Sequence, residues 1–364
     1  MHTHYHDIVQ LIDQIDPIQY GKTRNYLNGA VTRLSPYISR GIISTKQVAE
    51  IVLDKGYSPR EIDGFLKELA WRDYFQLVWQ ELKSNINKDV KQIQPGVNNY
   101  QVPLSIISAE TGIEAIDNGI LSLYETGYMH NHLRMYVASI SCNIAQCHWL
   151  QPAKWMYYHL LDADWASNAL SWQWVAASFS QKKYFANQEN INKYCNTNQR
   201  HTFLDQAYEL LPNMAIPEAL KATQVFDLTC TLPSCDELNI QNALPVYIYN
   251  FYNLDPKWDE HEEANRILLL EPEHFKDYPV GDKTIQFVLD LSKNIKNCKV
   301  YVGSFESLHQ QYASQNFHFK EHPLNGHFKG TQHERDWLFE NIKGYFPSFF
   351  SFWKQAEKQL KKRT

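Results

Sequence analysis

Residues 160 to 184 (LLDADWASNALSWQWVAASFSQKKY) concentrate two acids, an amide and three tryptophans in a single segment. Asp164, Asn168 and Trp172 follow one another at intervals of four residues. On a helix this interval places a carboxylate, an amide and an indole on one face, which would suit a flat polar ligand. The alternative is an amphipathic helix that buries its tryptophans in a core, because indoles are large apolar groups.

The composition predicts a globular protein. With 364 residues, the chain has room for two domains, or for one large domain with an appendage. Aromatic residues make up 14% of the chain, which excludes a disordered or collagen-like protein. The formal net charge of −5 does not indicate a nucleic-acid-binding protein, because such proteins usually have a basic surface. A local basic patch is still compatible, with scattered solvated charges as the alternative. Its candidate members are Arg24, Arg33, Arg40, Lys182, Lys183, Lys193 and Arg200.

The six cysteines show neither paired spacing nor partner histidines at zinc-finger spacing, so we expect free thiols and no metal site. Free thiols are typical of a reducing cytosol. The N-terminus lacks the basic and then apolar pattern of a signal peptide, and no uncharged apolar run is long enough to span a bilayer. The sequence therefore predicts a cytoplasmic protein that does not engage a membrane.

Three segments resemble signatures of one known family, the DNA photolyases and cryptochromes. They are Asp162–Ala176 (DADWASNALSWQWVA), Thr126–Ala138 (TGYMHNHLRMYVA) and Thr32–Tyr37 (TRLSPY), and they stand in the family's order. A further segment, Glu68–Asp73 (ELAWRD), resembles the helix that touches damaged bases in photolyases. Several matches in the right order are more specific than any one of them.

The resemblance implies a mostly α protein with an all-helical FAD-binding domain. Arginines can stabilise negative charge on a reduced flavin, and aspartates can accept hydrogen bonds from its N–H and ribityl groups. The residues that match the family's flavin-binding positions are Tyr20, Thr32, Arg33, Leu34, Ser35, Arg72, Asn131, Arg134, Asp162, Asp164 and Asn168.

The resemblance also implies light-dependent DNA repair, in which photoexcited FADH⁻ passes an electron to a flipped-out cyclobutane pyrimidine dimer. Damaged DNA, single- or double-stranded, is the implied partner, and aromatic walls would hold the unstacked bases. The residues that match lesion-binding positions are Glu68, Trp71, Met135 and Trp174. Those that match catalytic positions are Glu68, Asn131, Trp149, Asn168 and Trp172.

Two positions depart from the family's pattern. His132 stands where many photolyases have an arginine, which weakens the expected grip on a DNA phosphate. Trp149 and Trp172 match the middle and flavin-proximal members of the family's electron relay, but the distal tryptophan is missing and Ile106 occupies the nearest register. Either Trp155, Tyr157 or another aromatic residue completes the relay, or photoreduction follows a different or shorter path.

Two other function classes stay open beside repair. A cryptochrome-like blue-light sensor would bind FAD and signal through partners without repairing DNA, and a repair assay in light and darkness separates it from a photolyase. A helical structural protein without a cofactor is the second alternative. A yellow colour on purification would exclude it.

The last third of the chain differs from the rest. Residues 246–250 and 266–270 indicate buried strands, residues 282–295 indicate an amphipathic helix, and residues 298–302 indicate another strand. Strand, helix and strand in succession predict a parallel unit with a right-handed crossover. Residues 334–360 indicate a closing helix, whose aromatic cluster is expected to pack against the flavin domain.

We therefore expect a helical FAD-binding domain at 1–205, a linker at 206–240 and a small α/β domain at 241–364. The last of these vaguely resembles the photolyase antenna domain, which normally precedes the flavin domain. The reversed order suggests a permuted or truncated relative, and it leaves the binding of an antenna pigment open.

Overall fold

The structure is a computed structural model that describes residues 1–360. Its internal contacts divide the chain into two compact units. The first comprises residues 1–21, 32–83 and the chain from 229 onward, and we call it the sheet unit. The second comprises residues 22–31 and 84–228, and we call it the helical unit. The predicted fold class, mostly helical with a small parallel sheet, is confirmed.

A five-stranded sheet lies at the centre of the α/β part of the sheet unit. Its order is β5-β4-β3-β6-β7, and every neighbouring pair is parallel. The strands are β3 (Val246–Tyr249), β4 (Asn265–Leu270), β5 (Lys299–Val302), β6 (Phe317–Lys320) and β7 (Thr331–His333). All of β3 is buried, as expected of a central parallel strand that is covered on both faces. The three predicted strands and their parallel pairing are confirmed, and β6 and β7 are additional.

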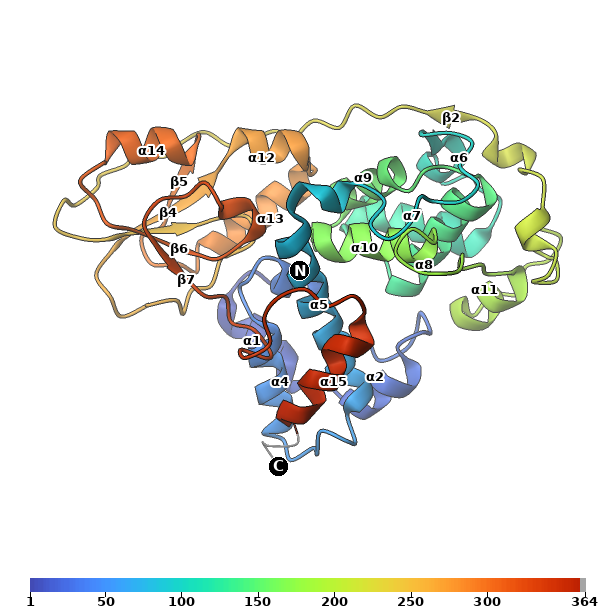
Figure 1. Cartoon of the computed structure of the whole chain (residues 1–364), viewed down its shortest axis with the longest axis horizontal. Coiled ribbons are helices and arrows are strands. Elements are labelled where there is room, and N and C mark those ends of the chain that lie inside the picture. Colours follow the sequence, from blue (N-terminus) through green and yellow to red (C-terminus); the bar gives the residue numbers. More distant parts are fainter. Residues whose placement is uncertain (361–364) are drawn as a thin grey trace. The chain divides into compact units, whose positions relative to one another are not determined.

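Three helices accompany this sheet, α12 (Pro272–Asp277), α13 (Asp282–Ser292) and α14 (Phe305–Gln311) (Figure 1). The predicted helix at 282–295 corresponds to α13. Apolar side chains of β3, β4, α14 and β6 form one core under α14. They are Val246, Ile248, Ile267, Leu269, Phe305, Leu308, Phe317 and Phe319.

The N-terminal part of the sheet unit is helical, and α5 is its main element, with α4 and α15 packed against it. The helices are α1 (Tyr5–Asp13), α2 (Pro17–Thr23), α3 (Ser35–Ser39), α4 (Thr45–Leu53), α5 (Asp63–Leu82) and α15 (Phe349–Leu360). The prediction of a helix from residue 334 was wrong, since α15 begins only at Phe349. Gly344, in a left-handed conformation, and Pro347 interrupt the chain before it.

The helical unit is built from short helices around a tryptophan-rich core. Its helices are α6 (Leu104–Ile107), α7 (Glu114–Thr126), α8 (Asn131–Ser139), α9 (Leu150–His159), α10 (Trp165–Val175) and α11 (Gln188–Cys195). A π-helical turn, Ile140–Ile144, continues α8. Two short strands, β1 (Val102–Pro103) and β2 (Thr223–Gln224), pair in antiparallel fashion.

The expected linker at 206–240 holds only two single 3₁₀ turns and β2 within an otherwise irregular chain. The contact units divide the chain differently from the predicted domains, because residues 1–21 and 32–83 group with the sheet. The predicted domain boundaries stay a prediction.

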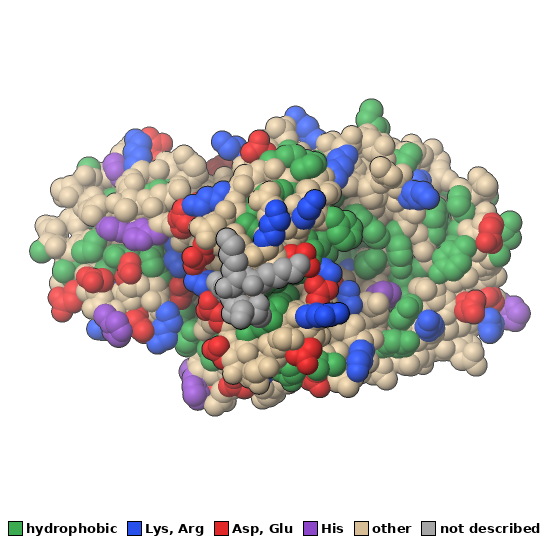
Figure 2. Space-filling model, turned by 60° about the horizontal axis from the view of Figure 1, so that its bottom comes forward, with side chains coloured by type: hydrophobic (Ala, Val, Ile, Leu, Met, Phe, Trp, Pro, Cys, Tyr) green, Lys and Arg blue, Asp and Glu red, His purple; other side chains and the backbone are tan. Residues whose placement is uncertain are grey.

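On the face drawn in Figure 2, Lys and Arg side chains are interspersed with Asp and Glu. Arg40, an expected member of a basic patch, is instead fully buried, with its guanidinium 3.5 Å from the centre of the Phe251 ring. All six cysteines are free thiols. Among residues 1–360, no helix has both the length and the apolarity needed to cross a bilayer.

Candidate functional site

The acidic segment before α10 is folded around two buried carboxylates. Asp164 is the N-cap of α10, and its Oδ1 accepts a hydrogen bond of 2.8 Å from the backbone N–H of Ser167. Asp162 lies two residues earlier, and its Oδ2 faces Nη1 of Arg134 at 3.0 Å. A short polar side chain before an apolar run is the usual start of a helix, so the same motif that predicts a ligand site also explains the fold.

Arg134 of α8 is held at two points. Its Nε donates to the backbone carbonyl of Met129 at 2.8 Å, and its Nη1 donates to Asp162. Because Asp162 is buried, this ion pair operates in a medium that screens charge less than water does. The arrangement fixes a guanidinium and a carboxylate side by side, and both belong to the residues with predicted flavin roles.

The α10 helix divides its polar and aromatic residues between core and surface. The amide nitrogen of Asn168 donates to the Ala153 carbonyl of α9 at 2.8 Å, which leaves its oxygen as an acceptor. Trp172 is buried, whereas Trp174 is 41% exposed beside Tyr184. Trp172 therefore packs as a core residue. Of these two indoles, only Trp174 is exposed enough to form a wall of a binding site.

The remaining predicted residues of the helical unit lie on α8 and before α9. Asn131 is exposed at the first position of α8, and Met135 is half-buried one turn later. Trp149 is fully buried, and its Nε1 donates to Oδ1 of Asp89 at 2.8 Å. Burial, and then the charge of Arg24, hold the pKa of His132 below its usual value, so this residue offers little positive charge to a phosphate.

In the sheet unit, the predicted phosphate-binding segment is a tight turn before α3. The Oγ1 of Thr32 accepts from the backbone N–H of Leu34 at 3.3 Å. Arg33 is exposed and has a φ of 53°, a left-handed conformation that costs a non-glycine residue on the order of 1 kcal/mol. Leu34 is buried, and Ser35 begins the helix. Tyr20 packs edge-on against Phe65 of α5.

Helix α5 carries the other three predicted residues. Arg72 donates from Nη1 to the Ser39 hydroxyl at 3.0 Å, which ties α5 to α3. Glu68 is half-buried. The Trp71 ring stacks on Phe349 of α15, with centroids 3.8 Å apart and planes 8° from parallel. One face of the indole that was predicted to hold a lesion is therefore covered by the protein's own C-terminal helix.

Two features of α5 were missed at the sequence level. The aromatic cluster at 346–353 signalled an internal contact, but nothing in its spacing named Trp71 as the partner. Asp73, next to the predicted residues, is buried and accepts from the Thr45 hydroxyl at 2.7 Å and the Leu338 backbone at 2.8 Å. Burial outweighs these hydrogen bonds and raises the pKa of Asp73 to about 6.

The predicted site residues are thus distributed over both units, and the contacts between them include the ion pair of Arg134 with Asp162 and the local bond of Leu34 to Thr32. The sheet unit holds Tyr20, Thr32, Arg33, Leu34, Ser35, Glu68, Trp71 and Arg72. The helical unit holds Asn131, Arg134, Met135, Trp149, Asp162, Asp164, Asn168, Trp172 and Trp174.

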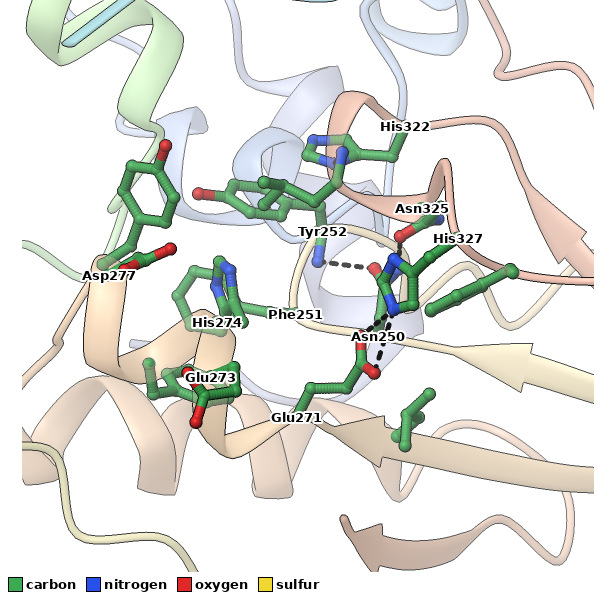
Figure 3. A pocket seen from close by; sticks show the side chains of 15 residues that line it. Asn250, Phe251, Tyr252, Glu271, Glu273, His274, Asp277, His322, Asn325 and His327 are labelled. Carbon is green, nitrogen blue, oxygen red and sulfur yellow. Dashed lines mark hydrogen bonds and ion pairs between the residues drawn. The ribbon is translucent and has the colours of Figure 1, made fainter. Parts of the chain in front are cut away.

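A separate cavity of about 210 Å³ lies in the sheet unit, beyond the carboxyl ends of β3 and β4 (Figure 3). Its walls include Tyr252 stacked on His322, and Glu271 hydrogen-bonded to His327 at 3.0 Å. Burial, and then the charge of Arg40, lower the pKa of His274 to about 3, so this imidazole is neutral. Among the described residues, no group of three or more histidine, cysteine or acidic side chains is arranged to hold a metal ion.

Comparison with known proteins places the resemblance in the middle of the chain. Residues 65–214 match the family model of the FAD binding domain of DNA photolyase. The deoxyribodipyrimidine photo-lyase of Alkalihalophilus pseudofirmus is 31% identical over 149 residues, which cover 40% of this chain and 31% of the relative. The deoxyribodipyrimidine photo-lyase of Agrobacterium fabrum is 31% identical over 182 residues, 46% of this chain and 37% of the relative.

Cryptochrome-1 of Arabidopsis thaliana is also similar, with 25% identity over 192 residues that cover 48% of this chain and 27% of the relative. The chain therefore spans about a third of the length of the curated relatives that it matches. The residues that match the family model include the segments 68–73, 126–138 and 162–176, whereas Thr32–Tyr37 lies before them.

Proposed function

We propose that this protein is a light-driven flavoprotein that repairs cyclobutane pyrimidine dimers in DNA, because residues 65–214 match the family model of the FAD binding domain of DNA photolyase. The observation that carries the proposal is the ion pair between the half-buried Arg134 and the buried Asp162, just before the N-terminus of α10 within the matched segment. Burying the Asp162 carboxylate is costly, and the guanidinium of Arg134 offsets part of that cost.

The side chains of the helical unit fit the edge of a flavin ring. That edge carries an imide N–H between two carbonyl oxygens, so it needs acceptors and donors close together. Asp162 supplies an acceptor and Arg134 a donor with positive charge. Asn168 keeps its amide oxygen available. When bound, FAD would supply light-driven electron transfer, and the protein would supply orientation and charge.

In this proposal Arg134 stabilises negative charge on the reduced cofactor, and Asp162 holds Arg134 in place. Trp174 is the exposed aromatic side chain of α10 and would stack on an unpaired base, which requires no sequence readout. Asn131 and Met135, one turn apart on α8, would contact the lesion. A damaged base pair is extruded more easily than an intact one, which favours lesions over normal DNA.

A specific observation favours a second candidate, a blue-light sensor that binds FAD without repairing DNA. Trp71, predicted to contact the lesion, is stacked on Phe349 rather than open on both faces. His132 is held neutral, and the charges on the surface drawn in Figure 2 are mixed. Each of these features is expected to weaken the binding of DNA.

The test is to record the absorption spectrum of the purified protein and then to illuminate it with blue light, reductant and an oligonucleotide that carries one pyrimidine dimer. We expect flavin bands and loss of the dimer in light only, measured by chromatography of the digested DNA. Trp174→Ala should weaken binding of the damaged oligonucleotide, whereas Tyr208→Ala, an exposed aromatic of the same unit, serves as the matched control. Flavin bands without light-dependent dimer loss would favour the sensor, and the absence of flavin would contradict both candidates.

A further inference from the structure

A row of aromatic rings leads from the core of the helical unit to its surface. Trp165 and Trp149 lie 6.5 Å apart between ring centroids, and His148 lies 5.8 Å from Trp149. The Tyr100 ring stacks on His148 at 5.2 Å, with planes 28° from parallel. Trp149 is fully buried, while Tyr100 is 68% exposed. The row therefore has one end in the core and the other in water.

Backbone contacts hold the outer end of this row in place. The N–H of His148 donates to the Asn99 carbonyl at 2.8 Å, and the N–H of Asn98 donates to the Gln146 carbonyl at 2.8 Å. These bonds join the loop that carries Tyr100 to the segment that carries His148. Backbone pairing therefore holds the two rings in their stacked arrangement.

A carboxylate accompanies the inner part of the row. The Nε1 of Trp149 donates to Oδ1 of Asp89 at 2.8 Å, and the same oxygen lies 3.4 Å from Nε2 of His148. The other oxygen, Oδ2, accepts from the backbone N–H of Gln94 at 2.8 Å, which fixes the carboxylate. A negative charge at the indole N–H stabilises the positive charge that develops when the indole loses an electron. The same oxygen can accept the indole proton.

A competing aromatic cluster in the same unit joins Trp155 to Tyr124 and His159, which are half-buried and therefore less exposed than Tyr100. Trp155 is fully buried and donates from Nε1 to the Tyr124 hydroxyl at 3.1 Å. That hydroxyl donates in turn to the Ile107 carbonyl at 2.6 Å. Burial raises the pKa of Tyr124 to about 12. Tyrosine gives up an electron readily only when its proton can leave, and a carbonyl partner does not take that proton.

We propose that Tyr100 is the terminal electron donor of this row of aromatic rings, and that His148 and Trp149 connect it to the core. This inference rests on the proposed function, because a bound FAD would supply the light-driven oxidation that removes one electron from Trp149. Trp149 then regains an electron from Tyr100, whose phenolic proton passes to water. The neutral tyrosyl radical is reduced by transfer of a hydrogen atom from a small-molecule thiol, and two thiyl radicals combine to a disulfide. Tyr100 thereby takes the place of the tryptophan that is missing at Ile106.

The first test locates the radical. The flavin-loaded full chain is illuminated without reductant in the presence of a nitroso spin trap, digested, and mapped by mass spectrometry. We expect the adduct on the peptide that contains Tyr100. It should be lost in Trp149→Phe, in which Tyr100 itself is intact, and retained in the matched control Trp155→Phe. An adduct on Tyr124 or Trp155 in the unaltered protein, with none on Tyr100, would overturn the inference.

The second test does not depend on flavin. An ultraviolet laser flash ionises tryptophans throughout the full chain, and transient absorption follows the transfer of oxidation from tryptophan to tyrosine. We expect a smaller rise of the tyrosyl band in Tyr100→Phe and in Trp149→Phe, and an unchanged rise in Trp155→Phe. Equal rises in all variants would contradict the inference even if the protein binds flavin. If the protein binds no flavin, the proposed function fails while this measurement still decides the route.

Asp89→Asn keeps an acceptor for the Trp149 N–H but removes its charge. We expect this variant to fold, as judged by circular dichroism, and to form less of the Tyr100 adduct. Because Asp89→Asn leaves the buried Trp149 indole in place, it still tests the route if Trp149→Phe fails to fold. An adduct yield equal to that of the unaltered protein would show that the carboxylate plays no part.

Discussion

Two tryptophans that match family positions are placed in opposite ways by the two units. In the helical unit, Trp149 is buried but connected to the surface through His148 and Tyr100, with a carboxylate at its N–H. In the sheet unit, Trp71 lies nearer the surface but is covered on one face by Phe349. The comparison shows that burial alone does not decide whether an aromatic side chain is available. Its neighbours decide which partner, an electron donor or a base, can reach it.

The largest effect should come from uncovering Trp71. Phe349→Ala removes a buried ring that stacks on the indole, so we expect the free energy of unfolding to fall by about 3 kcal/mol in a denaturant titration. If Trp71 is a lesion contact, the variant should also bind dimer-containing DNA more tightly. The matched control is Phe350→Ala, a neighbour that is 74% exposed and should change stability by less than about 0.5 kcal/mol.

The second prediction tests the ion pair between Arg134 and Asp162 in the helical unit. Arg134→Ala leaves the buried Asp162 without its guanidinium, and because Arg134 is partly exposed we expect a loss of about 2 kcal/mol. Flavin content, read from the absorption spectrum, should fall as well. Arg200→Ala removes a more exposed arginine, 3.8 Å from Asp205, and should change neither quantity measurably. Unchanged flavin content in Arg134→Ala would count against the assigned role of this pair.

A third prediction concerns acid and the sheet unit. The pKa of His274 is lowered to about 3 in the fold, so the unfolded chain binds more protons below pH 6.5 and stability should fall as the pH drops from 6.5 towards 3. The contribution of one such group is about 1.4 kcal/mol per pH unit. Asp73, with its pKa raised to about 6, acts in the opposite direction.

The pH test therefore compares variants rather than relying on one slope. His274→Leu should make the free energy of unfolding less dependent on pH in this window, as measured by denaturant titrations at several pH values. His261→Ala, at a residue that is almost fully exposed, should leave the dependence unchanged. Equal slopes in the two variants would show that His274 does not titrate as its burial predicts.

The smallest effect separates folding from cofactor binding at Asp164. Asp164→Ala removes the N-cap of α10 and should cost about 1 kcal/mol. Asp164→Asn keeps an oxygen that can accept from the Ser167 N–H, so its stability should match that of the unaltered protein. If Asp164 also binds flavin, the asparagine variant should still retain less of it. Full retention would reduce the role of Asp164 to capping.

Much of the fold was predictable because its signals are local. The buried runs of β3 and β4, the short strand β5, and the apolar periodicity of α5 and α13 each lie within a short stretch of sequence. Strands β6 and β7 were missed. The first is only four residues long and mixes His and Lys with two phenylalanines, and the second (TQH) is polar and mostly exposed. Their pairing depends on neighbours distant in sequence, which no local pattern reveals.

The candidate site was predictable in part, for the same reason. The cap at Asp164 follows from residues three apart, and the residues with predicted flavin roles came from the family resemblance. The partner of Trp71 could not be found in this way, since Phe349 lies far along the chain and aromatic stacking has no spacing rule. The route through Tyr100 was missed too, because a tyrosine in a polar loop carries no sequence signal. The roles assigned to the site residues stay predictions.

The chain connectivity of the sheet unit has a consequence for how the protein is made. Contacts such as Asp73 with Leu338 and Tyr5 with Asn294 join residues that are separated by most of the chain. Loops of this length close slowly, whereas the contacts that link α8, α9 and α10 join residues close in sequence. During synthesis, the N-terminal helices of the sheet unit must therefore wait for partner residues that emerge much later, while the helical unit, which lies between them in sequence, can already fold.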